Sequence, residues 1–248
     1  MTVSLPEGTW FGILRIVLLM LLALHVLHAV VTNRYHDSPR TKGHLFLSIL
    51  AQSPLFVVSF LYALGLGAFS RQLVSPLYIG LGLVAGHLIF VLSLLVTHRS
   101  LFDAYDFCFD VPSIWNFTVD YPIVLTRFIG VAVGEEIIWR AAAQTEILRR
   151  VGNPLLAILI VAVLFSIVHK HFFRNALGVS VEFLAFAVAL GALYYWTQSL
   201  ILVIVIHAVR DIEIAYLEYL VKVEEIGDAE LAAQEVERSF FRRHPEKA

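Results

Sequence analysis

Apolar stretches of membrane-spanning length alternate with short polar segments along the chain. A bilayer core of about 30 Å requires roughly 20 apolar residues in helical form. Stretches without Asp, Glu, Lys or Arg cover residues 16–33, 43–70, 72–98, 151–169 and 183–209. Together with the positions of Gly and Pro, this pattern predicts about seven spans (seven or eight), near residues 10–32, 45–69, 76–97, 121–148, 154–173, 180–197 and 199–220.

The composition favours a single all-α, polytopic transmembrane helix bundle. The chain has 248 residues, of which 59% are hydrophobic and 15% are charged, whereas an average soluble domain is nearer a quarter charged. These two fractions leave too little polar surface for a water-soluble globular protein and exclude that class. We expect residues 1–221 to form one transmembrane bundle and residues 222–248 to form a charged, solvated tail. The net charge of −2 gives no reason to expect a nucleic-acid partner.

The segment 98–120 differs from the apolar stretches on either side of it. It combines four aspartates with several Phe, Tyr and Trp residues. Aromatic side chains of this kind gather at the headgroup level of a bilayer. The segment therefore predicts an interfacial loop or a short amphipathic helix.

Ionisable residues within the predicted spans are the main indication of function, because each costs a few kcal/mol in the bilayer core. Three groups stand out: Glu135, Glu136 and Arg140 in the fourth span, His169 in the fifth, and His207 with Asp211 in the seventh. Other residues of this kind fit plainer roles. We expect Arg127 and Glu182 at span ends or snorkelling to the interface, and His25, His28 and His87 as packing residues.

Helical geometry predicts that Glu135 and His169 meet at one depth. Glu135 lies 15 residues before Arg150, and His169 lies 15 residues after Pro154. A tight turn joins these antiparallel helices, so a rise of 1.5 Å per residue puts both side chains about 22 Å from it.

The remaining members of the three groups fit the same site. Glu136 and Arg140 are four residues apart and predict an intrahelical ion pair. Glu135 is rotated by about 100° from Glu136 and is left to face His169 and His207. Asp211 lies one turn after His207 and shares its helix face.

These residues resemble the three motifs of the CPBP family of intramembrane proteases, which includes the CAAX prenyl endopeptidases and bacteriocin-processing or immunity proteins. Residues 134–140, GEEIIWR, resemble the EExxxR motif. Residues 165–169, FSIVH, resemble FxxxH, and residues 207–211, HAVRD, resemble HxxxN or HxxxD. The motifs occur in the same order on spans four, five and seven, so the resemblance covers about residues 121–215, the expected catalytic core.

The resemblance implies a glutamate-dependent intramembrane endopeptidase without an obligatory metal or other cofactor. By this resemblance, Glu135 and His169 would bind and activate water, and His207 with Asp211 would stabilise the oxyanion. Glu136 and Arg140 would support the site. The partners would be the lipid bilayer and a membrane-anchored or lipidated protein, such as a prenylated CAAX tail or a sorting or leader signal, in a prokaryotic cell (inner) membrane.

General chemistry agrees, because peptide hydrolysis needs a base for water and donors for the oxyanion. Asp211 stands where Asn is common in the prenyl proteases. An ionised Asp only accepts hydrogen bonds. Asp211 either donates in its protonated form or orients His207, which is then the donor.

Three other functions remain open from the sequence. The same Glu, His and Asp side chains could hold Zn²⁺ in a zinc-dependent variant, although the chain has no HExxH motif. A non-catalytic membrane adaptor or immunity protein could keep the fold without the chemistry. A proton or ion transporter could use buried Glu and His, but the sequence lacks the paired Gly- or Pro-broken spans and the repeats that would favour it.

Overall fold

The computed structural model describes residues 8–35, 42–69, 75–98 and 100–239. These residues form helices and connecting turns, with no strand among them, so the predicted all-α class is confirmed. The elements are α1 (Thr9–Tyr35), α2 (Lys42–Gly65), α3 (Pro76–His98), α4 (Leu101–Phe109), α5 (Val111–Asp120), α6 (Pro122–Glu136), the π-helix η2 (Ile137–Gln144), α7 (Thr145–Val151), α8 (Pro154–Val168), the 3₁₀ turn η3 (Lys170–Phe173), α9 (Leu177–Thr197), α10 (Leu200–Ile226) and α11 (Ala229–Ser239).

Three helical segments in the described part of the chain are long and apolar enough to cross a bilayer: Thr9–Thr32, Pro76–Thr97 and Leu177–Thr197. A fourth arises if the pair Val111–Asp120 and Pro122–Val151, which bends by 98°, counts as one broken span. Shorter apolar helices cover Gln52–Gly65 and Pro154–Val168. These helices indicate an integral membrane protein, while the number of seven spans stays a prediction.

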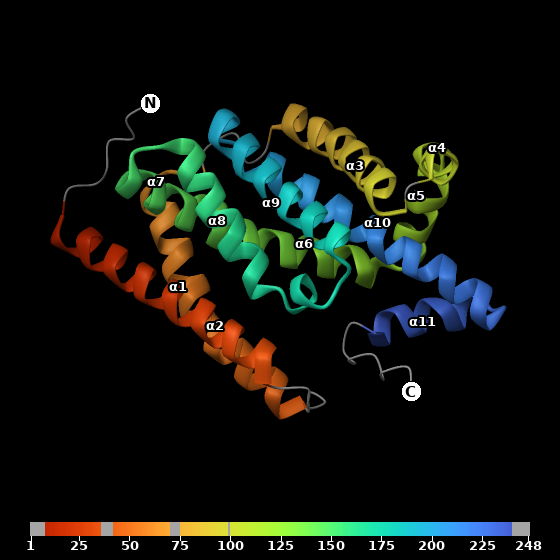
Figure 1. Ribbon diagram of the computed structural model, residues 1–248, viewed down its shortest axis with the longest axis horizontal. Helices are drawn as coiled ribbons and strands as arrows, with labels where there is room; N and C mark the ends of the chain where they lie inside the picture. Colours follow the sequence, from red (N-terminus) through yellow and green to blue (C-terminus); the bar gives the residue numbers. More distant parts are fainter. Residues whose placement is uncertain (1–7, 36–41, 70–74, 99, 240–248) are drawn as a thin grey trace.

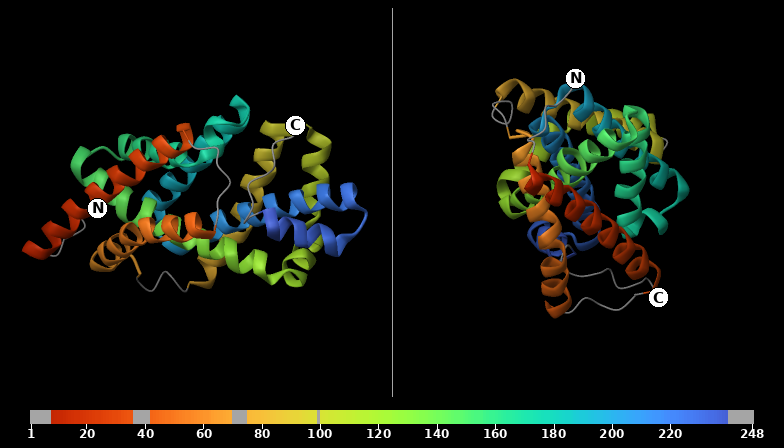
Figure 2. Two further views of the ribbon diagram at one scale, coloured as in Figure 1. Left: turned by 90° about the horizontal axis from the view of Figure 1, so that it is seen from below. Right: turned by 90° about the vertical axis from the view of Figure 1, so that its left-hand side faces the viewer.

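Helices α9 and α10 run through the middle of the molecule, α3 packs beside them along one edge, and α6 packs against α10 (Figure 1). The pair α1 and α2 lies toward one end, whereas α4, α5 and α11 lie toward the other (Figure 2). The central helices therefore frame the region that carries the predicted site.

Two glycines allow α3 to approach α10 closely. A Cβ atom added at Gly82 would lie 2.7 Å from Cβ of Val205, and one at Gly86 would lie 2.8 Å from Cβ of Val209. Small residues four apart permit this backbone approach in membrane helices, where packing replaces the hydrophobic effect. The contact fixes the part of α10 that carries His207.

His87 adds a polar contact to the same helix pair. Its Nδ1 lies 2.7 Å from Oε1 of Glu213 on α10, and its Nε2 lies 3.2 Å from the carbonyl oxygen of Cys108 at the end of α4. Because a carbonyl only accepts, Nε2 carries a proton. The expected packing residue therefore also contacts a carboxyl group on α10, which spacing within α3 could not reveal.

A buried carboxylate joins α7 to α1 and α2. Glu146 has no exposed side-chain surface and accepts from the Tyr62 hydroxyl at 2.8 Å. Nε atoms of Arg15, Arg149 and Arg150 donate to it at 3.2, 3.1 and 2.8 Å. Three guanidinium groups and a hydroxyl thus compensate for its burial.

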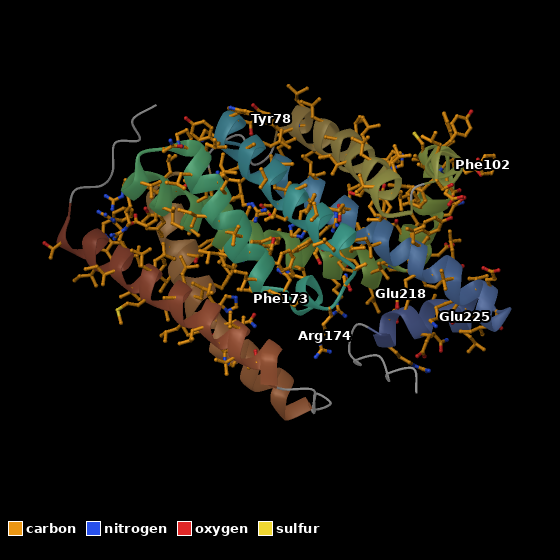
Figure 3. The ribbon with its side chains drawn as sticks, viewed as in Figure 1. Tyr78, Phe102, Phe173, Arg174, Glu218 and Glu225 are labelled. Carbon is orange, nitrogen blue, oxygen red and sulfur yellow. The ribbon has the colours of Figure 1, made fainter. Side chains whose placement is uncertain are left out.

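The segment 98–120 forms two short helices, α4 and α5, in place of one loop or helix. Phe107 and Phe117 are buried, whereas Phe102 and Trp115 are exposed. Phe102 projects from the outer end of α4 (Figure 3). The amphipathic pattern expected for this segment is present in both helices.

The C-terminal region differs from the predicted tail. Helix α10 continues to Ile226, past the predicted boundary at residue 221. In α11, Ala232, Ala233 and Val236 are buried against the bundle. Small and apolar residues on one face of α11 allow this packing, so residues 229–239 are partly covered by protein.

Candidate active site

The two adjacent glutamates end α6, and a π-helix follows them directly. Glu135 and Glu136 are the last residues of α6, and η2 begins at Ile137. π-Helical segments are rare and frequently occur at functional sites. The extra residue per turn changes the direction of the side chains that follow.

Side chains of η2 attach it to α9. Nη2 of Arg140 donates to the carbonyl oxygen of Ala187 at 3.3 Å, and Nε2 of Gln144 donates to that of Gly191 at 2.8 Å. A Cβ at position 191 would lie only 2.9 Å from Oε1 of Gln144. Gly191 therefore makes room for the polar side chain that holds the two helices together.

The predicted ion pair between Glu136 and Arg140 is confirmed. Nε of Arg140 lies 3.2 Å from Oε2 of Glu136, and both side chains are almost fully buried. The Arg140 guanidinium also stacks 4.6 Å above the ring centroid of Phe165 on α8. The pair thereby ties the glutamate motif to the helix that ends at His169.

His169 caps α8 and has a fixed tautomer. Helix α8 ends at Val168, and His169 has extended backbone angles, whereas the sequence predicted helix through residue 173. Its Nδ1 lies 2.6 Å from the carbonyl oxygen of Phe165. Nδ1 therefore donates its proton there, and Nε2 of the neutral ring is left as an acceptor.

Glu135 lies between the two imidazoles, as helical geometry predicted. Its Oε1 is 3.6 Å from Nε2 of His169, and its Oε2 is 3.8 Å from Nε2 of His207. The Glu135 side chain is 28% exposed. It is therefore accessible from the cavity, in contrast to Glu136, which is fully covered.

His207 has a carboxylate near each ring nitrogen. Its Nδ1 lies 2.7 Å from Oε1 of Glu136, and its Nε2 lies 3.5 Å from Oδ2 of Asp211. The sequence paired Glu136 with Arg140 and left open whether Asp211 orients His207 or donates in its protonated form. The structure adds Glu136 as the closer partner, because its two oxygens contact His207 and Arg140 separately.

These groups open into one cavity of about 880 Å³ between α3, α6, α9 and α10. Glu135, His169, His207 and Asp211 all line it. Apolar side chains cover much of the remaining wall, among them Phe90, Leu94, Phe128, Val131, Ile214 and Leu217. The cavity thus combines hydrolytic side chains with an apolar surface.

A second buried charge pair lines the same cavity. Nη2 of Arg210 on α10 donates to both oxygens of Glu182 on α9, at 2.8 and 3.1 Å. Ser93 on α3 also donates to Glu182. Glu182 is buried in this network and does not snorkel, because Arg210 compensates for its charge. Arg127, also expected at a span end, is half-buried and lines the cavity.

Among the described residues, no group of three or more His, Cys, Asp or Glu side chains is arranged to hold a metal ion.

Comparison with protein families identifies the region that contains this site. Residues 117–212 match the family described as type II CAAX prenyl endopeptidase Rce1-like. This region of the chain is similar to the Rce1-like family. The resemblance predicted from the three motifs is thus confirmed, and all seven motif residues lie within the matched region.

The Rce1-like family is a protease family, so the match points to a CAAX-type intramembrane protease. No curated protein and no solved structure matches the chain.

Proposed function

We propose that the chain is an intramembrane endopeptidase that hydrolyses a peptide bond in or beside a membrane-anchored protein segment. One observation carries the proposal: in an Rce1-like region, the Glu135 carboxylate lies between the imidazoles of His169 and His207 at the wall of a cavity. A base, a second proton carrier and an oxyanion donor are the groups that amide hydrolysis requires.

Water activation is assigned to Glu135 and His169. Their 3.6 Å separation is longer than a direct hydrogen bond and lets one water molecule contact both groups. Since Nδ1 of His169 donates to Phe165, Nε2 can accept a hydrogen bond from this water while Glu135 removes its other proton. The resulting hydroxide attacks the carbonyl carbon, and the proton held by Glu135 passes to the leaving amine.

Oxyanion stabilisation is assigned to His207. In its imidazolium form both ring nitrogens donate. Nδ1–H donates to Glu136, which leaves Nε2–H directed toward Asp211 and Glu135. A tetrahedral oxyanion in the cavity would replace Asp211 as the acceptor of the hydrogen bond from Nε2–H of His207. Glu136 and Arg140 act as positioning residues, since they hold the His207 ring and not the substrate.

The proposal places this chemistry in a prokaryotic inner membrane, on a chain that crosses the bilayer seven times. The crossings would be α1, α2, α3, the continuous α6–η2–α7 segment, α8, α9 and α10. The substrate would be a lipidated or otherwise membrane-anchored protein. No metal takes part in this mechanism, so metal analysis of the purified protein together with chelator treatment tests that part directly.

A comparison of membrane-protein termini tests the function. Cells with the wild-type chain and cells with Glu135→Gln are compared by mass spectrometry of protein N- and C-termini. Glu225→Gln is the matched control, because Glu225 is exposed at the end of α10 and lies outside the cavity. We expect processed termini with the wild type and the control only.

Purified protein in proteoliposomes supplies the second readout. Loss of the general base should lower hydrolysis of an S-farnesylated cysteine peptide by about 10²–10⁴-fold. Equal termini in all three strains, together with equal peptide hydrolysis by wild type and Glu135→Gln, would contradict the proposal. Equal thermal stability of the two proteins excludes misfolding as the cause of a difference.

A further inference from the structure

The ion pair between Glu182 and Arg210 has no part in the chemistry assigned above, although both residues line the cavity. Nη2 of Arg210 donates to both oxygens of Glu182, and the two side chains are only 9% and 7% exposed. Ser93 also donates to Glu182, so α3, α9 and α10 meet at one carboxylate. A buried ion pair is weak evidence for stability, because desolvation of the charges offsets their attraction. Its contacts with the site therefore indicate its role.

The guanidinium of Arg210 stacks on two phenyl rings of α9. Its Cζ lies 4.4 Å from the ring centroid of Phe186 and 5.7 Å from that of Phe183. A cation within about 6 Å of a ring centroid is attracted to the ring face. Because Glu182 holds the guanidinium in one orientation, the ion pair restricts where both rings can pack.

The same two rings contact the imidazoles of the candidate active site. The centroids of Phe183 and His169 lie 5.0 Å apart at an interplanar angle of 64°. Those of Phe186 and His207 lie 5.7 Å apart at 78°. Both are edge-to-face contacts, a preferred geometry of aromatic pairs. Each phenyl ring therefore connects Arg210 to one imidazole.

The ion pair of the glutamate motif has the same kind of contact. Arg140 pairs with Glu136 and stacks on Phe165. The Phe165 ring in turn lies 4.5 Å from the His169 ring and 6.2 Å from the His207 ring. The site thus contains two buried arginine–carboxylate pairs, each stacked on phenyl rings that contact the imidazoles.

We propose that Arg210, held by Glu182, is a positioning residue that orients His169 and His207 through Phe183 and Phe186. This inference rests on the proposed function and deepens it, because it assigns the geometry of both imidazoles to a charge pair that the chemistry itself does not use. Direct contact of Arg210 with the substrate is the competing assignment. The two assignments differ in kinetics, because positioning affects kcat and substrate contact affects KM.

Replacement of both charges tests the proposal. The double variant Glu182→Gln with Arg210→Gln, called the glutamine pair, leaves no unpaired charge in the protein. In proteoliposomes, kcat for an S-farnesylated cysteine peptide should fall by about tenfold to a hundredfold, because small displacements of catalytic groups cost this much. KM should stay within about twofold. Lys222→Gln with Glu225→Gln is the matched control, since it removes an ion pair of α10 outside the cavity and should change neither constant.

Substitution of a phenyl ring tests the same connection without removing a charge. Phe186→Leu should lower kcat, and adding the glutamine pair should then lower it by a smaller factor than in the wild type, because the shared contact is already lost. Phe102→Leu is the control, since Phe102 is exposed on α4, far from the cavity (Figure 3), and should keep the wild-type kcat. Thermal unfolding confirms that the compared proteins are folded.

Imidazole NMR spectra test the orientation of the rings independently of hydrolysis. The protein is labelled with ¹⁵N-histidine in lipid nanodiscs, and His169→Gln and His207→Gln assign the two sets of signals. We expect sharp signals for both rings in the wild type and in the Lys222 and Glu225 control. The glutamine pair should broaden both, because each ring exchanges between orientations.

Three results would overturn the inference. One is an increase of KM at unchanged kcat in the glutamine pair, which identifies Arg210 as a substrate contact. A second is an equal factor for the glutamine pair with and without Phe186→Leu. A third is a set of equally sharp imidazole signals in the wild type, the control and the glutamine pair. If the wild type hydrolyses no peptide but the glutamine pair broadens both signals, the protease proposal fails and the positioning role stands.

Discussion

Substitution of Gly86 by Ala should push α3 and α10 apart where Gly86 packs against Val209 and Ile206. The added Cβ would lie 2.8 Å from Cβ of Val209 and 3.1 Å from the carbonyl oxygen of Ile206. The backbone oxygen cannot rotate away as a flexible side chain can, so the helices must separate. Gly80 on the same helix is the matched control, because an added Cβ there meets nothing within 4 Å.

The magnitude follows from comparing the two variants. Ala is favoured over Gly in a helix by about 1 kcal/mol, and both variants share this gain. Overpacking of a close contact costs about 1–3 kcal/mol. The free energy of unfolding of Gly86→Ala should therefore be about 1–3 kcal/mol lower than that of Gly80→Ala.

The same separation should reach the candidate active site. Ile206 and Val209 lie on either side of His207 in α10, so a shift of this segment moves the His207 ring relative to Glu135. A displacement approaching 1 Å can cost up to about a hundredfold in rate. Unfolding in mixed micelles and peptide hydrolysis in proteoliposomes measure the two effects. If Gly86→Ala matches Gly80→Ala in both assays, the close contact does not position His207.

Three further predictions concern carboxylates and their partners. Glu146→Ala should lower the free energy of unfolding by about 3 kcal/mol, near the low end for a buried pair because its arginine partners are partly exposed, and unfolding in mixed micelles measures it. Arg140→Met should cost about 3–5 kcal/mol by leaving Oε2 of the buried Glu136 without its guanidinium partner. Adding Glu136→Gln should restore part of this stability, and a double variant equal to the sum of the single ones would show that the pair is not coupled. Asp211→Asn should keep peptide hydrolysis within about tenfold, whereas Asp211→Ala should lower it by about 10²–10³-fold; equal losses would contradict a hydrogen-bonding role at position 211.

The meeting of Glu135 and His169 could be predicted because it depends on local regularity. Equal numbers of residues on either side of a tight turn give equal depths in antiparallel helices. The ion pair between Glu136 and Arg140 followed in the same way from a spacing of four residues. Both predictions used a single helix or a helical hairpin, for which the sequence separation determines the geometry.

Contacts between helices that are distant in the sequence could not be predicted from residue spacing. The pairs Glu182–Arg210 and Glu136–His207 join segments 28 and 71 residues apart. Each member could be recognised as a buried charge in an apolar stretch, but its partner could not be chosen from spacing. The π-helix after Glu136 adds a change of phase that a period of 3.6 residues does not contain.

The number of membrane spans is also only partly predictable from the sequence. Helix α2 contains Pro54, and α10 carries several charged residues in its second half. Helices α3 and α9 line the cavity and still satisfy the hydropathy criterion, whereas α10 also carries Arg210, Asp211 and Glu213 and does not. A cluster of charged residues therefore makes a site helix harder to identify as a span.

Adjacent glutamates of identical chemistry acquire different environments from the fold. Consecutive residues of a helix point about 100° apart, so α6 can direct one carboxylate into the cavity and the other into the protein. Glu136 is enclosed by Arg140 and His207, and its two oxygens are taken by these partners. Glu135 keeps exposed surface and contacts His169 and His207 only at 3.6 and 3.8 Å. Tight contacts would immobilise a carboxylate that must exchange protons, whereas loose contacts would not hold an imidazole in place. The pair of adjacent residues therefore lets one short segment provide both a candidate base and the support for its neighbouring His207.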